Sequence, residues 1–141
     1  MVTHSPEETQ KYAATFLTDL IQSGMHVVAL VGDLGSGKTT FVQGLAQTLH
    51  IEHQIVSPTF TLLQQYPIAG HEYFDSLSHL DVYRLNTLDE VFELGIEEIF
   101  ENKRSLVLIE WADKVREILP DDVCEVAFFV QGNEHEIRCE I

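Results

Sequence analysis

The feature that most limits what this chain can fold into is the stretch from Val28 to Gly44, VALVGDLGSGKTTFVQG. The apolar, β-branched run from His26 to Gly32 is typical of a strand buried on both faces of a parallel sheet. A glycine-rich turn follows, and residues 38–50 carry the four-residue apolar spacing of a helix. A strand, a glycine-rich loop and a helix in this order form the opening of a βαβ unit.

Residues 32–39 match the pattern G-x-x-x-x-G-K-[ST] at every position. Glycines let backbone N–H groups approach phosphate oxygens closely, and the positive end of the following helix attracts the same anion. In such a loop the lysine, here Lys38, reaches the β- and γ-phosphates, and the next hydroxyl, here Thr39, is the usual Mg²⁺ ligand. The candidate residues for binding the phosphates are Asp33, Leu34, Gly35, Ser36, Gly37, Lys38, Thr39 and Thr40.

Two acidic residues are candidates to complete the site, because Mg²⁺ held only by a hydroxyl and phosphates needs a carboxylate nearby. Glu110 ends the apolar run LVLIE, on a strand that we expect beside the first one. Asp81 lies in HLDVYRL, where a two-residue alternation puts His79, Asp81 and Tyr83 on one face. We assign the metal to Thr39 and Glu110, so that Asp81 is a second metal contact or orients the attacking water. The two acids could exchange these roles, or either could be solvated.

Three other residues have both a functional and a structural interpretation. Thr59 follows the predicted nucleotide helix, where a threonine of switch-type NTPases contacts the γ-phosphate or its metal. Thr59 could equally bond its own loop backbone. We expect His79 to be a core histidine with a satisfied hydrogen bond rather than a catalytic group. Trp111 is expected in the core, with packing beside the site or contact with a partner as the alternatives.

The whole chain, residues 1–141, is expected to form one domain. Helices are predicted over 5–24, capped by Ser5, and over 87–103, capped by Thr87. The fold class is α/β, a three-layer α/β/α domain of the P-loop NTPase type with a mixed, partly antiparallel central sheet. Strands are predicted at 26–32, 60–66, 79–85, 105–111, 122–131 and 134–141. We expect 60–66 to pair antiparallel with 79–85, and 74–78 to form a surface excursion. Gly132 and Asn133 are expected to form the turn of a terminal hairpin.

The charge balance limits the partners of the protein. Eight Lys and Arg stand against 23 Asp and Glu, which gives a net charge of −15 at pH 7. Because affinity for nucleic acid comes mainly from Lys and Arg contacts to phosphate, we expect no direct, stable binding of DNA or RNA. The acidity serves either solubility or a basic protein partner.

The sequence carries no pattern of export or membrane insertion. The segment MVTHSPEETQKY is polar and acidic, and no apolar run reaches the roughly 20 residues that span a bilayer. We therefore expect a cytoplasmic protein. We also expect the protein to be monomeric or weakly oligomeric by itself. Cys124 and Cys139 could face each other across the terminal hairpin, and we expect them to be free, buried thiols.

Several segments together carry a resemblance to a known family. GDLGSGKTT, SPTFTL, HLDVYRL, LGIEEIF and LIEWADK…LP occur in the order seen in the bacterial TsaE (YjeE) family, and the likeness covers nearly the whole chain. The His-x-Asp-x-Tyr-Arg and Ile-Glu-Trp segments are more specific than the phosphate loop. The resemblance implies a small P-loop ATPase that hydrolyses ATP slowly alone. It also implies that the protein works with TsaB-like and TsaD-like partners to make N6-threonylcarbamoyladenosine in tRNA.

The same resemblance implies roles for individual residues. For the nucleotide base, the turn of the terminal hairpin offers Asn133 and His135, and the N-terminal segment offers Ser5 and Pro6. For the phosphates, the matching positions are Gly32 to Thr40, and for the metal they are Thr39 and Glu110. Asp81 matches the aspartate of the family motif. Further motif positions fall on Thr59, Tyr83, Arg84 and Trp111.

Two other functions are compatible with the same loop. A small P-loop kinase needs a lid and arginines around a second substrate, but this chain has only four arginines and no insertion long enough for a lid. A module that binds ATP without hydrolysing it would have the same loop. Asp81 and Glu110 together favour hydrolysis, because simple binding needs fewer acids near a polyanion.

Overall fold

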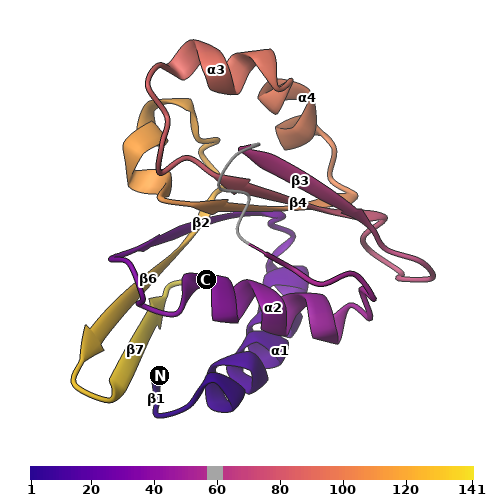
Figure 1. Ribbon diagram of the computed structural model, residues 1–141. Coiled ribbons are helices and arrows are strands. Elements are labelled where there is room, and N and C mark those ends of the chain that lie inside the picture. The colour runs from indigo at the N-terminus through magenta and orange to yellow at the C-terminus, as the bar shows by residue number, and fades with distance from the viewer. Residues whose placement is uncertain (57–61) are drawn as a thin grey trace.

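A single mixed sheet organises the fold (Figure 1). The computed structural model describes residues 1–56 and 62–141, so the predicted site residue Thr59 lies outside the described residues. Within these ranges the sheet has seven strands in the order β1-β7-β6-β2-β5-β4-β3. The strands are β1 (Val2–Thr3), β2 (Val27–Gly32), β3 (Leu63–Pro67), β4 (Ser76–Asp81), β5 (Ser105–Glu110), β6 (Cys124–Gln131) and β7 (Glu134–Cys139).

The direction of the strands changes from the centre of the sheet to its edges. The four central strands β6, β2, β5 and β4 are parallel to their neighbours in that group. The outer strands β3, β7 and β1 each pair antiparallel. The mixed, partly antiparallel sheet and the antiparallel pairing of β3 with β4 are therefore confirmed.

Helices cover both faces of the sheet (Figure 1). On one face lie α1 (Pro6–Ser23) and α2 (Lys38–Thr48), and on the other lie α3 (Leu88–Glu93), α4 (Ile96–Glu101) and the 3₁₀ helix η1 (Ala112–Ile118). Adjacent residues of β5 alternate between the two cores, with Leu106 and Leu108 on the α1/α2 side and Val107 and Ile109 on the other. This burial on both faces confirms the three-layer α/β/α class.

Helix α1 begins and ends at the residues that the sequence marks. The Ser5 hydroxyl accepts a hydrogen bond from the backbone N–H of Glu8 at 3.1 Å, and Pro6 occupies the first turn. The Glu8 carboxylate in turn accepts from the backbone N–H of His4 at 2.8 Å. Gly24 follows the helix with a φ of +78°, the left-handed conformation that ends many helices.

The predicted strand at 79–85 is displaced along the chain. β4 begins at Ser76, inside the predicted surface excursion, and ends at Asp81. It stops because the chain turns directly afterwards, where the backbone N–H of Tyr83 donates to Asp81 Oδ1 and that of Leu85 donates to the carbonyl of Val82. The excursion and the strand end were therefore predicted wrongly, while the facing of Asp81 was predicted correctly.

The single helix predicted over 87–103 is two short helices. They meet at Gly95, whose φ of +76° is left-handed and interrupts the helix. Thr87 is the residue before α3, but its side chain makes no capping hydrogen bond. The Glu90 carboxylate instead accepts from the backbone N–H of Asn86 at 3.4 Å.

The C-terminal hairpin forms as predicted. Gln131 and Glu134 are register partners on either side of the two-residue turn. Cys124 and Cys139 face each other as free thiols with 3.4 Å between their sulfur atoms, the first buried and the second half-buried. Strand β1, which the sequence did not predict, pairs with β7 at the sheet edge.

No helix in the described ranges is both long and apolar enough to cross a bilayer.

The close packing of α1 on α2 depends on Gly44. A Cβ at this position would lie 2.6 Å from the Cα of Gln10 and 2.9 Å from the Cβ of Ala13, so the helices would have to separate. We expect Gly44→Ala to lower the free energy of unfolding by about 1–3 kcal/mol. This loss should appear although alanine favours a helix by about 1 kcal/mol over glycine.

Urea denaturation measures this change. Gln47→Ala, at an exposed position of the same helix, is the control and should stay within about 0.5 kcal/mol of the unsubstituted protein. Equal or higher stability of Gly44→Ala would contradict the close packing of the two helices.

Candidate functional site

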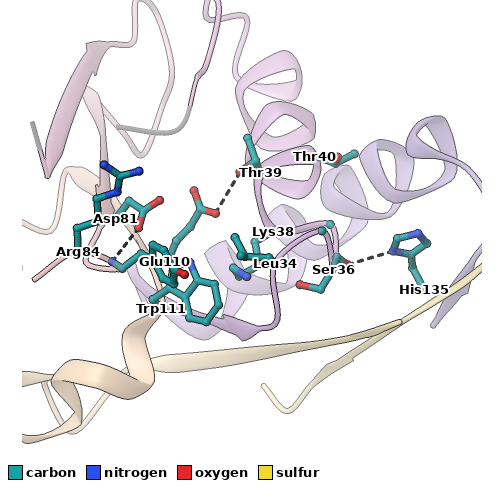
Figure 2. A pocket seen from close by; sticks show the side chains of 13 residues that line it. Leu34, Ser36, Lys38, Thr39, Thr40, Asp81, Arg84, Glu110, Trp111 and His135 are labelled. Atoms are coloured by element: carbon teal, nitrogen blue, oxygen red, sulfur yellow. Dashed lines mark hydrogen bonds between the residues drawn. The ribbon is translucent and has the colours of Figure 1, made fainter. Parts of the chain in front are cut away.

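The candidate site lies at the carboxyl ends of three neighbouring parallel strands (Figure 2). β2 ends at Gly32 and runs into the glycine-rich loop, β5 ends at Glu110, and β4 ends at Asp81. In the register of the sheet, Leu30 pairs with Glu110, and Glu110 pairs with Asp81. Both predicted acids therefore lie beside the loop.

A cavity of about 550 Å³ opens at this edge of the sheet. Its size is that of a typical small-molecule pocket. It is lined by the loop residues 34–40 and by Asp81, Tyr83, Arg84, Glu110, Trp111 and His135.

Four predicted binding residues do not line this cavity, namely Asp33, Ser5, Pro6 and Asn133. Asp33 shapes the loop through its backbone, because its carbonyl accepts a hydrogen bond from the N–H of Ser36 at 3.1 Å. Ser5 and Pro6 form the start of α1, and Asn133 lies in the turn between β6 and β7. Of the four predicted base contacts, only His135 reaches the cavity wall.

The Lys38 side chain is folded back over its own loop. Its Nζ donates to the carbonyls of Gly32 at 2.5 Å and Asp33 at 2.9 Å, and it lies 4.2 Å from the centre of the Trp111 ring. Burial lowers the pKa of the Lys38 ammonium, and the nearby carboxylates, first among them Glu110, oppose this shift. The ammonium is thus partly desolvated and faces the acids of the site.

A hydrogen bond from His135 connects the glycine-rich loop to the C-terminal hairpin. The ring Nδ1 of His135 donates to the carbonyl of Ser36 at 3.1 Å, a bond that joins residues 99 positions apart (Figure 2). Gly37, the next residue, has a φ of +106°, which favours glycine. The Ser36 hydroxyl is buried and has no partner among the described residues.

Glu110 connects the loop helix to the strands. Its Oε1 accepts a hydrogen bond from the Thr39 hydroxyl at 3.1 Å, and its Oε2 is 2.5 Å from the Nε2 of His79. Glu110 is 3% exposed and His79 is fully buried. The interpretation of Glu110 as a solvated strand-end acid is therefore wrong.

An aromatic pair forms another wall of the cavity. The rings of Tyr83 and Trp111 lie 4.7 Å apart between centres, and Lys114 donates to the carbonyl of Tyr83 at 2.5 Å. Trp111 directly precedes η1 and has a left-handed φ of +61°. It is partly buried against the core on the α3/α4 side of the sheet and also lines the cavity. Core packing and packing beside the site are therefore both present, while contact with a partner stays a prediction.

The oxygen atoms of Thr39 and Glu110 could bind a hard divalent cation that also has phosphate and water ligands. A hydroxyl on Thr39 and a carboxylate on Glu110 are oxygen ligands of the kind that Mg²⁺ prefers. The described residues contain no group of three or more His, Cys, Asp or Glu placed to hold a metal by themselves. A magnesium ion here would take its remaining ligands from phosphates and water.

Comparison with known proteins decides the family. A family profile described as "Threonylcarbamoyl adenosine biosynthesis protein TsaE" matches residues 3–138. This chain belongs to the TsaE family. The resemblance drawn from the sequence motifs is thereby confirmed, and it places the chain among P-loop proteins of the ATPase type.

Curated members of the TsaE family align with nearly the whole chain. "tRNA threonylcarbamoyladenosine biosynthesis protein TsaE" of Bacillus subtilis is 38% identical over 98% of this chain and 89% of its own length. The protein of the same name from Treponema pallidum is 40% identical over 85% of this chain and 83% of its own length. The crystal structure of Bacillus subtilis YdiB superposes with a TM-score of 0.68 at 32% identity, and the match covers 97% of this chain and 80% of that chain.

The sequence did not predict the bond between His79 and Glu110. We expected a core histidine with a satisfied hydrogen bond, and His79 is indeed fully buried with its Nε2 bonded to Glu110. Its Nδ1 has no partner among the described residues. The signal was present in the alternation of β4. His79 and Asp81 share a face, and the parallel pairing of β4 with β5 brings Glu110 to that face.

The link between His135 and the loop carbonyl generates a prediction about loop stability. Replacing His135 with alanine removes a hydrogen bond worth about 1 kcal/mol. We expect the loop amides at 35–37 to exchange with solvent roughly five times faster in His135→Ala. Hydrogen-exchange mass spectrometry measures the rates, with the exposed His4→Ala as control. Unchanged exchange at these amides would show that the hairpin does not hold the loop.

Proposed function

We propose that this protein binds and hydrolyses ATP and that this activity serves the formation of N6-threonylcarbamoyladenosine in tRNA. The observation that carries the proposal is the meeting of the phosphate loop with two strand-end acids in one cavity. The named role of the TsaE relatives in tRNA threonylcarbamoyladenosine biosynthesis supplies the biological setting.

In this proposal the loop and α2 hold the phosphates of ATP. Backbone N–H groups of residues 34–39 and the N-terminal end of the 11-residue helix α2 face the anion. Lys38 would exchange its bonds to the Gly32 and Asp33 carbonyls for the phosphate oxygens. His135, already bonded to the loop, is the candidate that the cavity favours for contact with the base or ribose.

Thr39 and Glu110 are the residues that would hold Mg²⁺ next to the phosphates. A bound magnesium ion would neutralise negative charge on the transferred phosphoryl group. Asp81, at the adjacent strand end, is proposed to orient the attacking water. Arg84 also lines the cavity and can offset charge that develops on the phosphates.

The kinase alternative has less support from the same cavity. A kinase would need further cationic groups for a second phosphate-bearing or hydroxyl substrate. Lys38 and Arg84 are the cationic side chains that the described cavity lining contains, apart from His135. A non-hydrolysing module that binds ATP with Mg²⁺ would still use Glu110, but it would not need Asp81 to orient an attacking water. Turnover measurements separate such a module from the ATPase.

We also propose that the site is completed by TsaB-like and TsaD-like partners. The cavity is open to solvent next to the exposed Leu34, 71% of whose surface is accessible. An acidic protein with a net charge of −15 is suited to assist a tRNA-modifying complex without binding the tRNA itself. This role would place the protein in the cytoplasm with its tRNA-modifying partners.

The first test of the proposed function concerns binding. Lys38→Ala should weaken ATP binding at least about tenfold, because it removes a charge-assisted hydrogen bond to phosphate. Titration with a fluorescent ATP analogue measures the Kd. Lys103→Ala removes an exposed charge elsewhere on the surface and is the control. Equal affinity of Lys38→Ala and the unsubstituted protein would exclude a phosphate-binding role for this lysine.

The second test concerns turnover. Glu110→Gln and Asp81→Asn should each lower kcat for ATP hydrolysis by about a hundredfold, because each removes a carboxylate from the reacting centre. Phosphate release in the presence of Mg²⁺ measures the rate, and Glu97→Gln on the exposed surface of α4 is the control. If neither variant changes turnover while ATP still binds, the catalytic assignment is wrong.

A further inference from the structure

A buried histidine lies directly behind the carboxylate of the candidate metal ligand. His79 is fully buried, Glu110 is 3% exposed, and His79 Nε2 is 2.5 Å from Glu110 Oε2. The other oxygen of the same carboxylate, Oε1, accepts the Thr39 hydroxyl at 3.1 Å. The two oxygens of Glu110 are therefore divided, one facing into the protein and one facing α2 and the cavity.

The sheet fixes the positions of both side chains. In the parallel pairing of β4 with β5, His79 is the partner of Leu108 and Asp81 is the partner of Glu110. His79, Asp81 and Glu110 therefore stand on the same face, with His79 one pleat deeper in the sheet. A ring that has no exposed surface and stands on a central strand cannot turn away into water.

The unpartnered nitrogen of the ring indicates which nitrogen carries the proton. Nδ1 of His79 is buried and has no partner among the described residues. A buried N–H without an acceptor is costly, and the neutral ring has one donor and one acceptor nitrogen. The arrangement that leaves no N–H unpaired is a ring with its proton on Nε2, donating to the Glu110 carboxylate.

We propose that His79 is a positioning residue for the metal-binding carboxylate. By holding Oε2, it leaves Glu110 a single orientation in which Oε1 is directed with the Thr39 hydroxyl toward the phosphates. Outer partners that fix a ligand in this way commonly contribute 10- to 100-fold to metal affinity, by the general behaviour of metal sites. This inference rests on the proposed function, because it requires that Glu110 bind Mg²⁺ together with the nucleotide.

Three substitutions separate positioning from simple core packing. His79→Gln places a side-chain amide close to where the ring Nε2 stands, so the donor to Glu110 is kept. His79→Asn ends near the position of Nδ1, so its amide does not reach Oε2. His79→Leu removes the donor altogether and keeps an apolar side chain of moderate volume.

The readout is the coupling between metal and nucleotide. For each variant the Kd of a fluorescent, non-hydrolysable ATP analogue is measured with Mg²⁺ and again with EDTA, and the ratio of the two is compared. Damage to the fold would weaken both Kd values together and leave the ratio unchanged. We expect the unsubstituted protein and His79→Gln to keep a large ratio, and His79→Asn and His79→Leu to lose about tenfold or more of it.

A ratio that is the same in His79→Asn as in the unsubstituted protein would overturn the positioning role. A ratio near one in the unsubstituted protein itself would overturn the magnesium site of the proposed function, and the inference with it. These two failures are distinct, since only the second one appears without any substitution.

A measurement on the unsubstituted protein covers the case in which a variant does not fold. NMR of the imidazole nitrogens of His79 should report a proton on Nε2, and its signal should shift more when Mg²⁺ joins the nucleotide than when nucleotide binds alone. A proton on Nδ1, or a His79 signal that does not respond to Mg²⁺, would contradict the proposal.

Discussion

The pairing of β5 between β2 and β4 is the constraint on which the rest of the structure depends. These three parallel strands are buried on both faces, so the two carboxylates that they carry stand where the strands end, with the buried His79 bonded behind one of them. The register then brings the phosphate loop, Glu110 and Asp81 to one edge. In open α/β sheets such edges are where ligands bind.

The other elements hold this edge in shape. Helix α2 packs closely on α1 through Gly44 and thereby fixes the direction from which its N-terminal end faces the loop. The C-terminal hairpin, which lies on the other side of β2 from β5, contacts the loop through His135. Beneath the loop, the buried pair of His79 and Glu110 connects the proposed metal-binding position to the core of the sheet. Parts of the chain far apart in sequence thus determine one small cavity.

Local signals in the sequence account for much of this arrangement. The residues that cap α1, the apolar runs of β2 and β5, and the hairpin turn were readable because each depends on neighbours in sequence. The end of β4 at Asp81 and the break at Gly95 depend on turns that the apolar spacing of these segments does not reveal. The bond of His79 to Glu110 joins two strands and depends on their register, which a single sequence does not determine. The fold class and most of the site were therefore predictable, and the contacts beneath the site were not.

The central claim is that this edge of the sheet hydrolyses ATP and that partner proteins complete the site. The most direct measurement is steady-state phosphate release with Mg²⁺ by the purified protein, alone and with a TsaB–TsaD-type pair. We expect slow release by the protein alone and a clear stimulation by the pair. Tight ATP binding without release in either condition would contradict it, and would indicate a protein that senses nucleotide without consuming it.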